Sequence, residues 1–232
     1  HGGGQPEELL ACQLRHAHRD STANRPARGN PVPYNRGVDL LTAISRVLPF
    51  AVASGVNLYA TVAVAGLCSR FGLVQLPEQF RGFDHPLVIT AALLLYGVEF
   101  VADKVPWVDT LWDGVHTVIR PVGGAFVAVA ALGEASPAAQ GAVALLGGSV
   151  ALSSHLAKAG ARAVANTSPE PFTNWGLSLA EDVFVIGLTW FAFEHPWLAT
   201  AVAAALIVAI AAAASLIVRA VRRRFSRRTV TA

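Results

Sequence analysis

The sequence predicts an all-α integral membrane protein, a polytopic bundle of helices that crosses a lipid bilayer several times. Of its 232 residues, 53% are hydrophobic and 14% are charged, whereas roughly 25% of the residues in an average soluble domain are charged. The mean hydropathy is positive, at +0.48. The apolar residues also gather in long runs instead of spreading evenly along the chain. These three observations exclude an ordinary water-soluble domain.

Six apolar segments, separated by polar stretches, predict about six transmembrane helices. A spanning helix needs about 20 residues, and the first and last segments are long enough as they stand. The others continue into stretches whose polar residues keep helical spacing, so we expect longer helices there. Pro49, Gly55 and Asn57 interrupt the first segment, which favours a kinked or broken helix. The segments are 47–67, 86–101, 118–132, 138–157, 177–193 and 196–218.

Composition divides the chain into three parts. Residues 1–36 are polar and basic and are predicted to be a disordered tail, residues 37–220 form the transmembrane domain, and residues 221–232 form a basic cytoplasmic tail. The net charge is +3. Basic residues beside apolar segments are typical of membrane topology, so we predict no nucleic-acid partner. The terminal run RAVRRRFSRR suits anionic lipid headgroups.

The distribution of Lys and Arg between the loops predicts the orientation in the membrane. With six spans, the cytoplasmic parts hold both basic tails together with Lys104, Arg120, Lys158 and Arg162. The external loops hold two arginines. Because cytoplasmic loops carry an excess of Lys and Arg, we predict that both termini are cytoplasmic.

Charged residues follow the second apolar segment at helical spacing. Glu99 and Asp103 are four residues apart and therefore share one helix face. Pro106 marks a break or a new helix start. Beyond it, four polar residues recur at spacings of four, three and four: Asp109, Asp113, His116 and Arg120. Apolar residues occupy the opposite side, so we predict an amphipathic helix with a narrow polar stripe that leads through Pro121 into the third segment.

A second polar stripe follows the fourth apolar segment. It consists of His155, Lys158, Arg162 and Asn166, spaced three, four and four residues apart. Prolines then end that helix, and Glu181 and Asp182 stand at the edge of the fifth apolar segment. Charges in a membrane are costly unless they face the interior, find partners or line water. Because the first stripe is mostly acidic and the second mostly basic, we expect the two to complement each other on the cytoplasmic side.

Three motifs resemble an uncharacterised bacterial membrane family catalogued as domain of unknown function 4126. They are GVNLYATVAVAGL at 55–67, EFVADKVPWVDTLWDGVHTVIRP at 99–121 and SPEPFTNWGLSLAED at 168–182, within a resemblance that covers residues 40–220 approximately. The resemblance implies a multi-pass helical protein of a bacterial inner membrane. It implies no established activity, so no catalytic residue is carried over.

The acidic surplus of the two stretches favours a transporter or channel for a small cation or a proton-coupled solute. Carboxylates withdrawn from water exchange protons near neutral pH, which is how such carriers are commonly coupled. The predicted ion-binding residues are Glu99, Asp103, Asp109, Asp113, His116, Glu181 and Asp182. The predicted charge-pairing or anion-binding residues are Arg120, His155, Lys158 and Arg162. No cofactor is evident other than a bound cation, and catalytic residues stay unassigned.

Two other functions stay open, although we predict a transporter in preference to an enzyme. In a membrane-embedded, metal-dependent lipid-phosphate enzyme, Glu99 and Asp103 would hold the metal, while Lys158 and Arg162 would bind phosphate. In a non-catalytic scaffold, the charges would serve assembly alone. The expected partners are the lipid bilayer and a small ion or solute, and the sequence also allows a homo-oligomer.

Overall fold

The computed structural model describes residues 40–74, 78–167 and 171–228, and these residues are helical, without a strand. The all-α prediction is therefore confirmed for the described part of the chain. The predicted tail at 1–36 lies outside the described residues, as do the last four residues of the predicted tail at 221–232.

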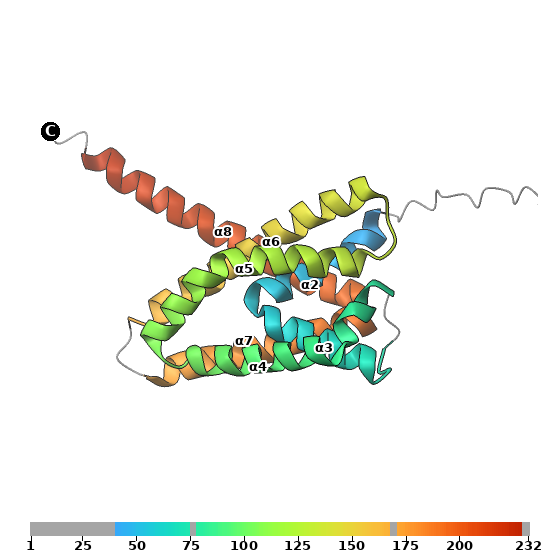
Figure 1. Cartoon of the computed structure of the whole chain (residues 1–232). Helices are drawn as coiled ribbons and strands as arrows, with labels where there is room; N and C mark the ends of the chain where they lie inside the picture. The colour runs from blue at the N-terminus through green and yellow to red at the C-terminus, as the bar shows by residue number, and fades with distance from the viewer. Residues whose placement is uncertain (1–39, 75–77, 168–170, 229–232) are drawn as a thin grey trace, which may run out of the picture. The chain divides into compact units, whose positions relative to one another are not determined.

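Seven α-helices and one 3₁₀-helix make up the described residues (Figure 1). A proline occupies the first position of each helix from α4 to α8, where its fixed φ suits a helix start and its missing N–H costs nothing. Pro106 accordingly begins a helix, as predicted. The elements are α2 (Leu40–Val56), α3 (Leu58–Arg70), η1 (Glu78–Asp84), α4 (Pro86–Ala102), α5 (Pro106–Leu132), α6 (Pro137–Ala165), α7 (Pro171–Glu194) and α8 (Pro196–Arg228).

Four of the described helices, α5 to α8, are long and apolar enough to cross a membrane. The pair η1 and α4 is bent by 67° and passes the same test when the two are taken together, which gives a fifth span. The polytopic membrane class is thus supported. The number of spans differs from the predicted six because α2 and α3, with 17 and 13 residues, are each shorter than a spanning helix.

The break between α2 and α3 falls at Asn57, inside the segment that the sequence presents as long enough for one spanning helix. Asn57 leaves the helical conformation, at φ −148° and ψ 100°, and its side-chain oxygen accepts a hydrogen bond from the Ala60 amide at 2.9 Å. This is the N-cap arrangement that asparagine favours. The polar side chain therefore starts a second helix where hydropathy alone predicts continuity.

The chain turns back between α2 and α3, so that the outer ends of both helices lie at one end of the bundle (Figure 1), and we call these two helices the re-entrant pair. Near the start of α2, the Ser45 carbonyl accepts a hydrogen bond from Thr200 in the first turn of α8, at 3.1 Å. Near the end of α3, Gly66 lies against the Phe83 carbonyl just before α4 begins. The starts of α4 and α8 lie at the same end, because the helices from α4 to α8 alternate in direction. Asn57, at the tip, reaches the middle of α7.

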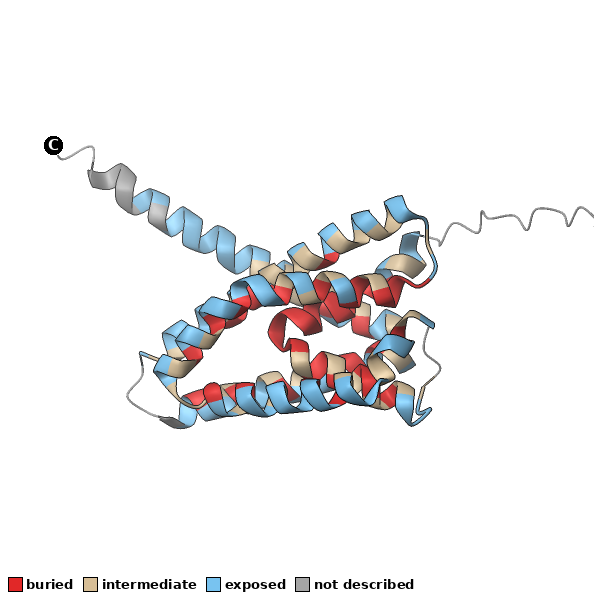
Figure 2. Cartoon of the chain, viewed as in Figure 1, coloured by how far each residue is buried: buried red, intermediate tan, exposed pale blue. Residues whose placement is uncertain are grey.

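The interior and the outer surface divide polarity in the way a membrane protein requires. Val118, Phe126 and Leu145 are 70%, 72% and 76% exposed, whereas Arg120 and Glu99 are fully buried. Figure 2 shows the buried residues on the faces that the helices turn toward one another. A lipid environment favours this arrangement, since apolar side chains can face the hydrocarbon while polar groups find partners inside.

Small residues bring α5 and α6 close together over the half that holds no charges. A Cβ added to Gly124 would meet the side chain of Ala151, and one added to Gly147 would meet that of Ala128. Such contacts allow helices in a membrane to pack backbone against backbone. A short aromatic cluster of Phe50, Phe80 and Phe193 fills the interior near the same end, with ring centroids 4.9 to 5.7 Å apart.

Candidate functional site

The two predicted polar stripes and both acidic pairs meet in the interior and form one cluster, which we call the buried charge cluster. Ten of its eleven predicted members are buried, and the eleventh, Glu181, has a side chain that is 12% exposed. The members are Glu99 and Asp103 on and just after α4; Asp109, Asp113, His116 and Arg120 on α5; His155, Lys158 and Arg162 on α6; and Glu181 and Asp182 on α7. Four helices therefore contribute to the cluster.

Glu99 lies between two basic side chains from different helices. Its Oε1 atom is 2.6 Å from Arg120 Nη2 and 3.1 Å from Lys158 Nζ. Both bases contact the same carboxylate oxygen, and Glu99 Oε2 has no hydrogen-bond partner among the described residues. Arg120 Nη1 also lies 3.8 Å from Asp113 Oδ1. The pairing predicted for Arg120 and Lys158 is thus present, but it leaves acceptor capacity unused.

Arg162 and Lys158 are shared among several carboxylates nearer the end of the bundle. Arg162 Nη2 contacts Asp103 Oδ2 at 2.5 Å, and its Nε lies 3.4 Å from Glu181 and 3.7 Å from Asp109. Lys158 Nζ lies 3.3 Å from Asp103 and 3.6 Å from Glu181. Each of these two bases therefore faces three carboxylates.

Two histidines connect the cluster to the backbone through one ring nitrogen each. His155 Nδ1 accepts a hydrogen bond from Arg120 Nη1 at 2.7 Å, because a guanidinium can only donate. His155 Nε2 therefore carries the proton and donates to the Asp113 carbonyl at 3.1 Å. His116 Nδ1 donates to the Trp112 carbonyl at 2.7 Å, which leaves Nε2 to accept from the Tyr59 hydroxyl at 2.8 Å.

Asn57, Tyr59 and Ser178 belong to this region but are absent from the residues predicted as the site. Asn57 Nδ2 donates to Asp182 Oδ1 at 3.2 Å, so the helix break is fixed against the cluster. Ser178, one turn before Asp182 on α7, is fully buried and its hydroxyl has no partner among the described residues. A signal for Asn57 was present in the sequence, since it interrupts an apolar segment. Nothing in the sequence pairs Tyr59 with His116.

The cluster holds more acidic than basic groups. It contains six carboxylates and three permanent bases, so an excess of three negative charges remains when all are ionised and both histidines are neutral. Six carboxylate oxygens, one on each acid of the cluster, lack a hydrogen-bond partner among the described residues. Uncompensated charge in a low-dielectric interior is strongly unfavourable. The arrangement can therefore take up positive charge, as protons or as a cation.

The cluster extends from one end of the bundle toward its middle. On α5, Asp109 and Arg120 are eleven residues apart, which corresponds to about 16 Å along the helix axis. The hydrocarbon core of a bilayer is about 30 Å thick. The chain of charged groups therefore covers roughly half of that thickness, and it ends beside the re-entrant tip at Asn57.

No group of three or more His, Cys, Asp or Glu side chains in the described ranges is arranged to hold a metal ion. Glu99 and Asp103, the residues that the sequence offers as metal ligands, both face basic side chains instead. Lys104 makes no ion pair with the described members of the cluster: its ammonium donates to the Phe100 carbonyl at 2.8 Å and lies 3.1 Å from the centroid of that residue's ring. Burial lowers the pKa of Lys104.

The family described as Domain of unknown function (DUF4126) matches residues 44–215, which include every member of the buried charge cluster. This match confirms the resemblance that the three motifs indicate. No curated protein and no solved structure matches the chain.

Proposed function

We propose that this chain, which belongs to the family described as Domain of unknown function (DUF4126), is a transporter or channel that carries a small cation or a proton-coupled solute across the membrane. The observation that carries the proposal is the acidic excess of the buried charge cluster. Ionisable side chains inside a membrane are costly and usually mark ion paths or proton relays. A purely structural network would be expected to balance its charges, because each unmatched carboxylate adds a desolvation cost.

The re-entrant pair supports the same proposal. At the end of α2, the Gly55 carbonyl accepts a hydrogen bond from Arg120 at 3.3 Å, and at the start of α3, Asn57 holds Asp182. Interrupted helices in transporters place their half-helix ends at ion and substrate sites near the middle of the membrane. Here both half-helix ends contact members of the cluster, so a bound ion can influence the position of the break.

The geometry also leads us to propose a topology with five crossings, formed by α4 to α8, and a re-entrant α2–α3 pair. Leu40 and Arg223 would then lie on opposite sides of the membrane, instead of both being cytoplasmic. The end of α8 carries exposed Arg222 and Arg223, which suit anionic headgroups on the cytoplasmic side. We propose the inner membrane of a bacterium as the location, in keeping with the family resemblance.

Cysteine labelling tests this topology. In a background with both native cysteines replaced by Ser, the variants Leu40→Cys, Glu78→Cys and Arg223→Cys are treated in intact cells with a membrane-impermeant maleimide. The proposal predicts that Leu40→Cys and Glu78→Cys react from one side and that Arg223→Cys reacts from the other. Labelling of Leu40→Cys and Arg223→Cys from the same side would restore the arrangement with six spans.

Transport itself is tested in proteoliposomes that contain the purified full chain and an internal pH indicator. A panel of cations is imposed with and without a pH gradient, and the expected result is cation-dependent proton movement that empty liposomes lack. Release of phosphate from an isoprenoid phosphate without any cation flux would overturn the transporter hypothesis in favour of the lipid-phosphate enzyme. Absence of both activities, with a changed oligomeric state on Glu99→Ala or Asp103→Ala, would favour the scaffold.

A further inference from the structure

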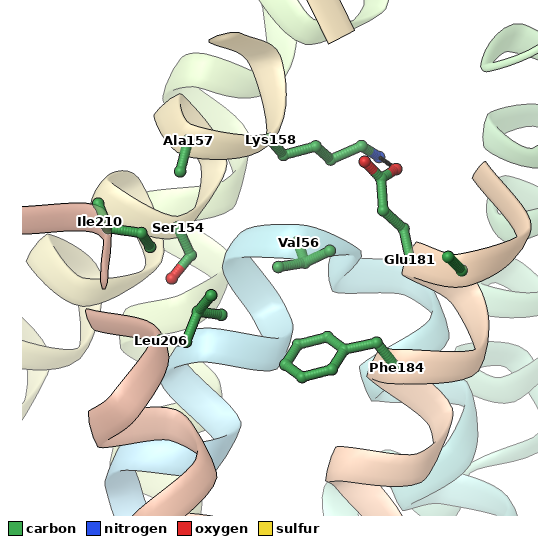
Figure 3. Close-up of a pocket in the computed structure, with 9 residues that line it drawn as sticks. Val56, Ser154, Ala157, Lys158, Glu181, Phe184, Leu206 and Ile210 are labelled. Atoms are coloured by element: carbon green, nitrogen blue, oxygen red, sulfur yellow. Dashed lines mark ion pairs between the residues drawn. The ribbon is translucent and has the colours of Figure 1, made fainter. Parts of the chain in front are cut away.

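A pocket of about 310 Å³ lies against the buried charge cluster, between α2, α6, α7 and α8 (Figure 3). Most of its wall is apolar, and Val56, Ala157, Phe184, Leu206 and Ile210 supply it. Its volume falls at the lower end of the range for small-molecule sites, roughly 300 to 1,000 Å³. The pocket therefore has the size and the lining of a site for a small, largely apolar ligand.

Two charged groups of the cluster, Lys158 and Glu181, form one boundary of this pocket. Figure 3 shows their side chains extended toward each other, above Val56 and Phe184. Their charged atoms are 3.6 Å apart. The Glu181 side chain is 12% exposed, whereas the other cluster side chains in its ion pairs, Lys158 and Arg162, are 2% and 1% exposed. Glu181 is therefore the carboxylate that a ligand in the pocket can reach.

The charge balance around Glu181 favours a cationic ligand over an anionic one. Lys158 is already shared with Glu99 and Asp103, at 3.1 and 3.3 Å, so its charge is more than compensated. An anion in the pocket would meet a region with excess negative charge, whereas a cation would reduce that excess. The ring of Phe184 adds a face that attracts cations.

We propose that this pocket binds a lipophilic monovalent organic cation, an alkylammonium ion whose charged group pairs with Glu181 while its chain lies against the apolar wall. The proposal rests on the proposed function in that it names the substrate class for the same cluster. Binding can nevertheless be measured without transport, so the two can fail separately.

The test measures the binding of radiolabelled hexyltrimethylammonium to the purified full chain in detergent micelles. Two unlabelled competitors separate charge from shape: 2,2-dimethyloctane replaces the nitrogen by carbon, and octanoate carries the opposite charge. We expect hexyltrimethylammonium to bind and neither competitor to displace it. Displacement by octanoate, lost on Lys158→Gln, would identify an anion or fatty-acid site and overturn the proposal.

Three variants complete the test. Glu181→Gln keeps the side-chain shape and should weaken binding by about tenfold or more, since an interaction with a charged partner is lost. Ala157→Trp fills the pocket without altering a charge and should abolish binding even if Glu181→Gln proves poorly folded. Glu78→Gln, at a side chain that is 72% exposed, should bind like the wild type. Unchanged affinity in both Glu181→Gln and Ala157→Trp would disprove the site.

The outcomes distinguish this inference from the proposed function. Cation flux in proteoliposomes without binding of hexyltrimethylammonium would retain the transporter and reject the lipophilic substrate. Binding that depends on Glu181, in a protein that moves no ion, would retain the site and reject transport.

Discussion

Helices α5 and α6 each divide into two halves of opposite character, and the halves lie against each other. The first half of α5 and the last half of α6 carry the charges from Asp109 to Arg120 and from His155 to Arg162. The remaining halves carry the small residues that allow close contact, such as Gly124 against Ala151 and Gly147 against Ala128. Packing explains the sequence of the apolar half. The charged half contains groups that packing does not require and that cost energy to bury, which is why we assign function there.

The largest effect on stability is expected where one buried base contacts several carboxylates. Arg120→Ala would remove one of the two bases that contact Glu99, the base near Asp113 and the hydrogen-bond donor to His155, and so increase the uncompensated negative charge of the cluster. We expect a loss of about 3–5 kcal/mol in the free energy of unfolding, the range measured when one partner of a buried pair is removed. Chemical unfolding in mixed micelles measures it.

The control for Arg120→Ala is Arg81→Ala, at an exposed pair with Glu78 in which the side chains are 73% and 72% exposed. That change should stay within about 1 kcal/mol. Equal losses of unfolding free energy in the two variants would mean that the ion pairs of the buried charge cluster contribute no more to stability than an exposed ion pair does.

The helix break provides a second comparison, because Asn57 caps α3 and also donates a hydrogen bond to Asp182 in the cluster. Asn57→Ala loses the N-cap, at about 1 kcal/mol, and leaves Asp182 without its donor, at about 1–3 kcal/mol. Asn57→Ser keeps a capping oxygen but is too short to hold Asp182, so its loss of unfolding free energy should be intermediate. If the serine variant equals the wild type, the contact with Asp182 contributes nothing to stability.

A smaller effect is expected in the apolar half. Gly124→Ala places a methyl group against Ala151, and such overpacking costs about 1–3 kcal/mol. Gly141→Ala on α6 meets nothing within 4 Å, so it should be neutral or stabilise the helix by up to about 1 kcal/mol. Thermal unfolding of the two variants in the same detergent measures the difference. A Gly124→Ala protein as stable as the wild type would show that the interface between α5 and α6 accommodates an added methyl group.

Much of the fold could be predicted from hydropathy and proline positions, because these report local preferences. The course of α5 from Pro106 through Pro121, and the single face shared by Asp109, Asp113 and Arg120, follow from helical spacing. A break near Asn57 could be predicted, because this residue interrupts an apolar segment. The direction in which the chain turns there could not, since it depends on contacts with α7 and α8 that lie more than a hundred residues away. Hydropathy counts that segment as apolar and gives no reason for it to turn back.

The membership of the cluster was predictable, whereas its pairing was not. Spacing places Lys158 and Arg162 on one face of α6, but only the fold shows that each of them faces three carboxylates. The pocket beside Glu181 depends on Leu206 and Ile210 of α8, in a part of that helix whose sequence is uniformly apolar and gives no sign of the pocket.

The most direct test of the central claim compares proton movement in proteoliposomes of the wild type, Asp182→Asn and Glu78→Gln. Asp182 is buried and one of its oxygens has no hydrogen-bond partner among the described residues, so the amide variant removes a charge while keeping the shape. If the buried charge cluster carries protons or cations, cation-dependent flux falls to the level of empty liposomes in Asp182→Asn and is unchanged in Glu78→Gln. Wild-type flux in a folded Asp182→Asn protein would contradict the account.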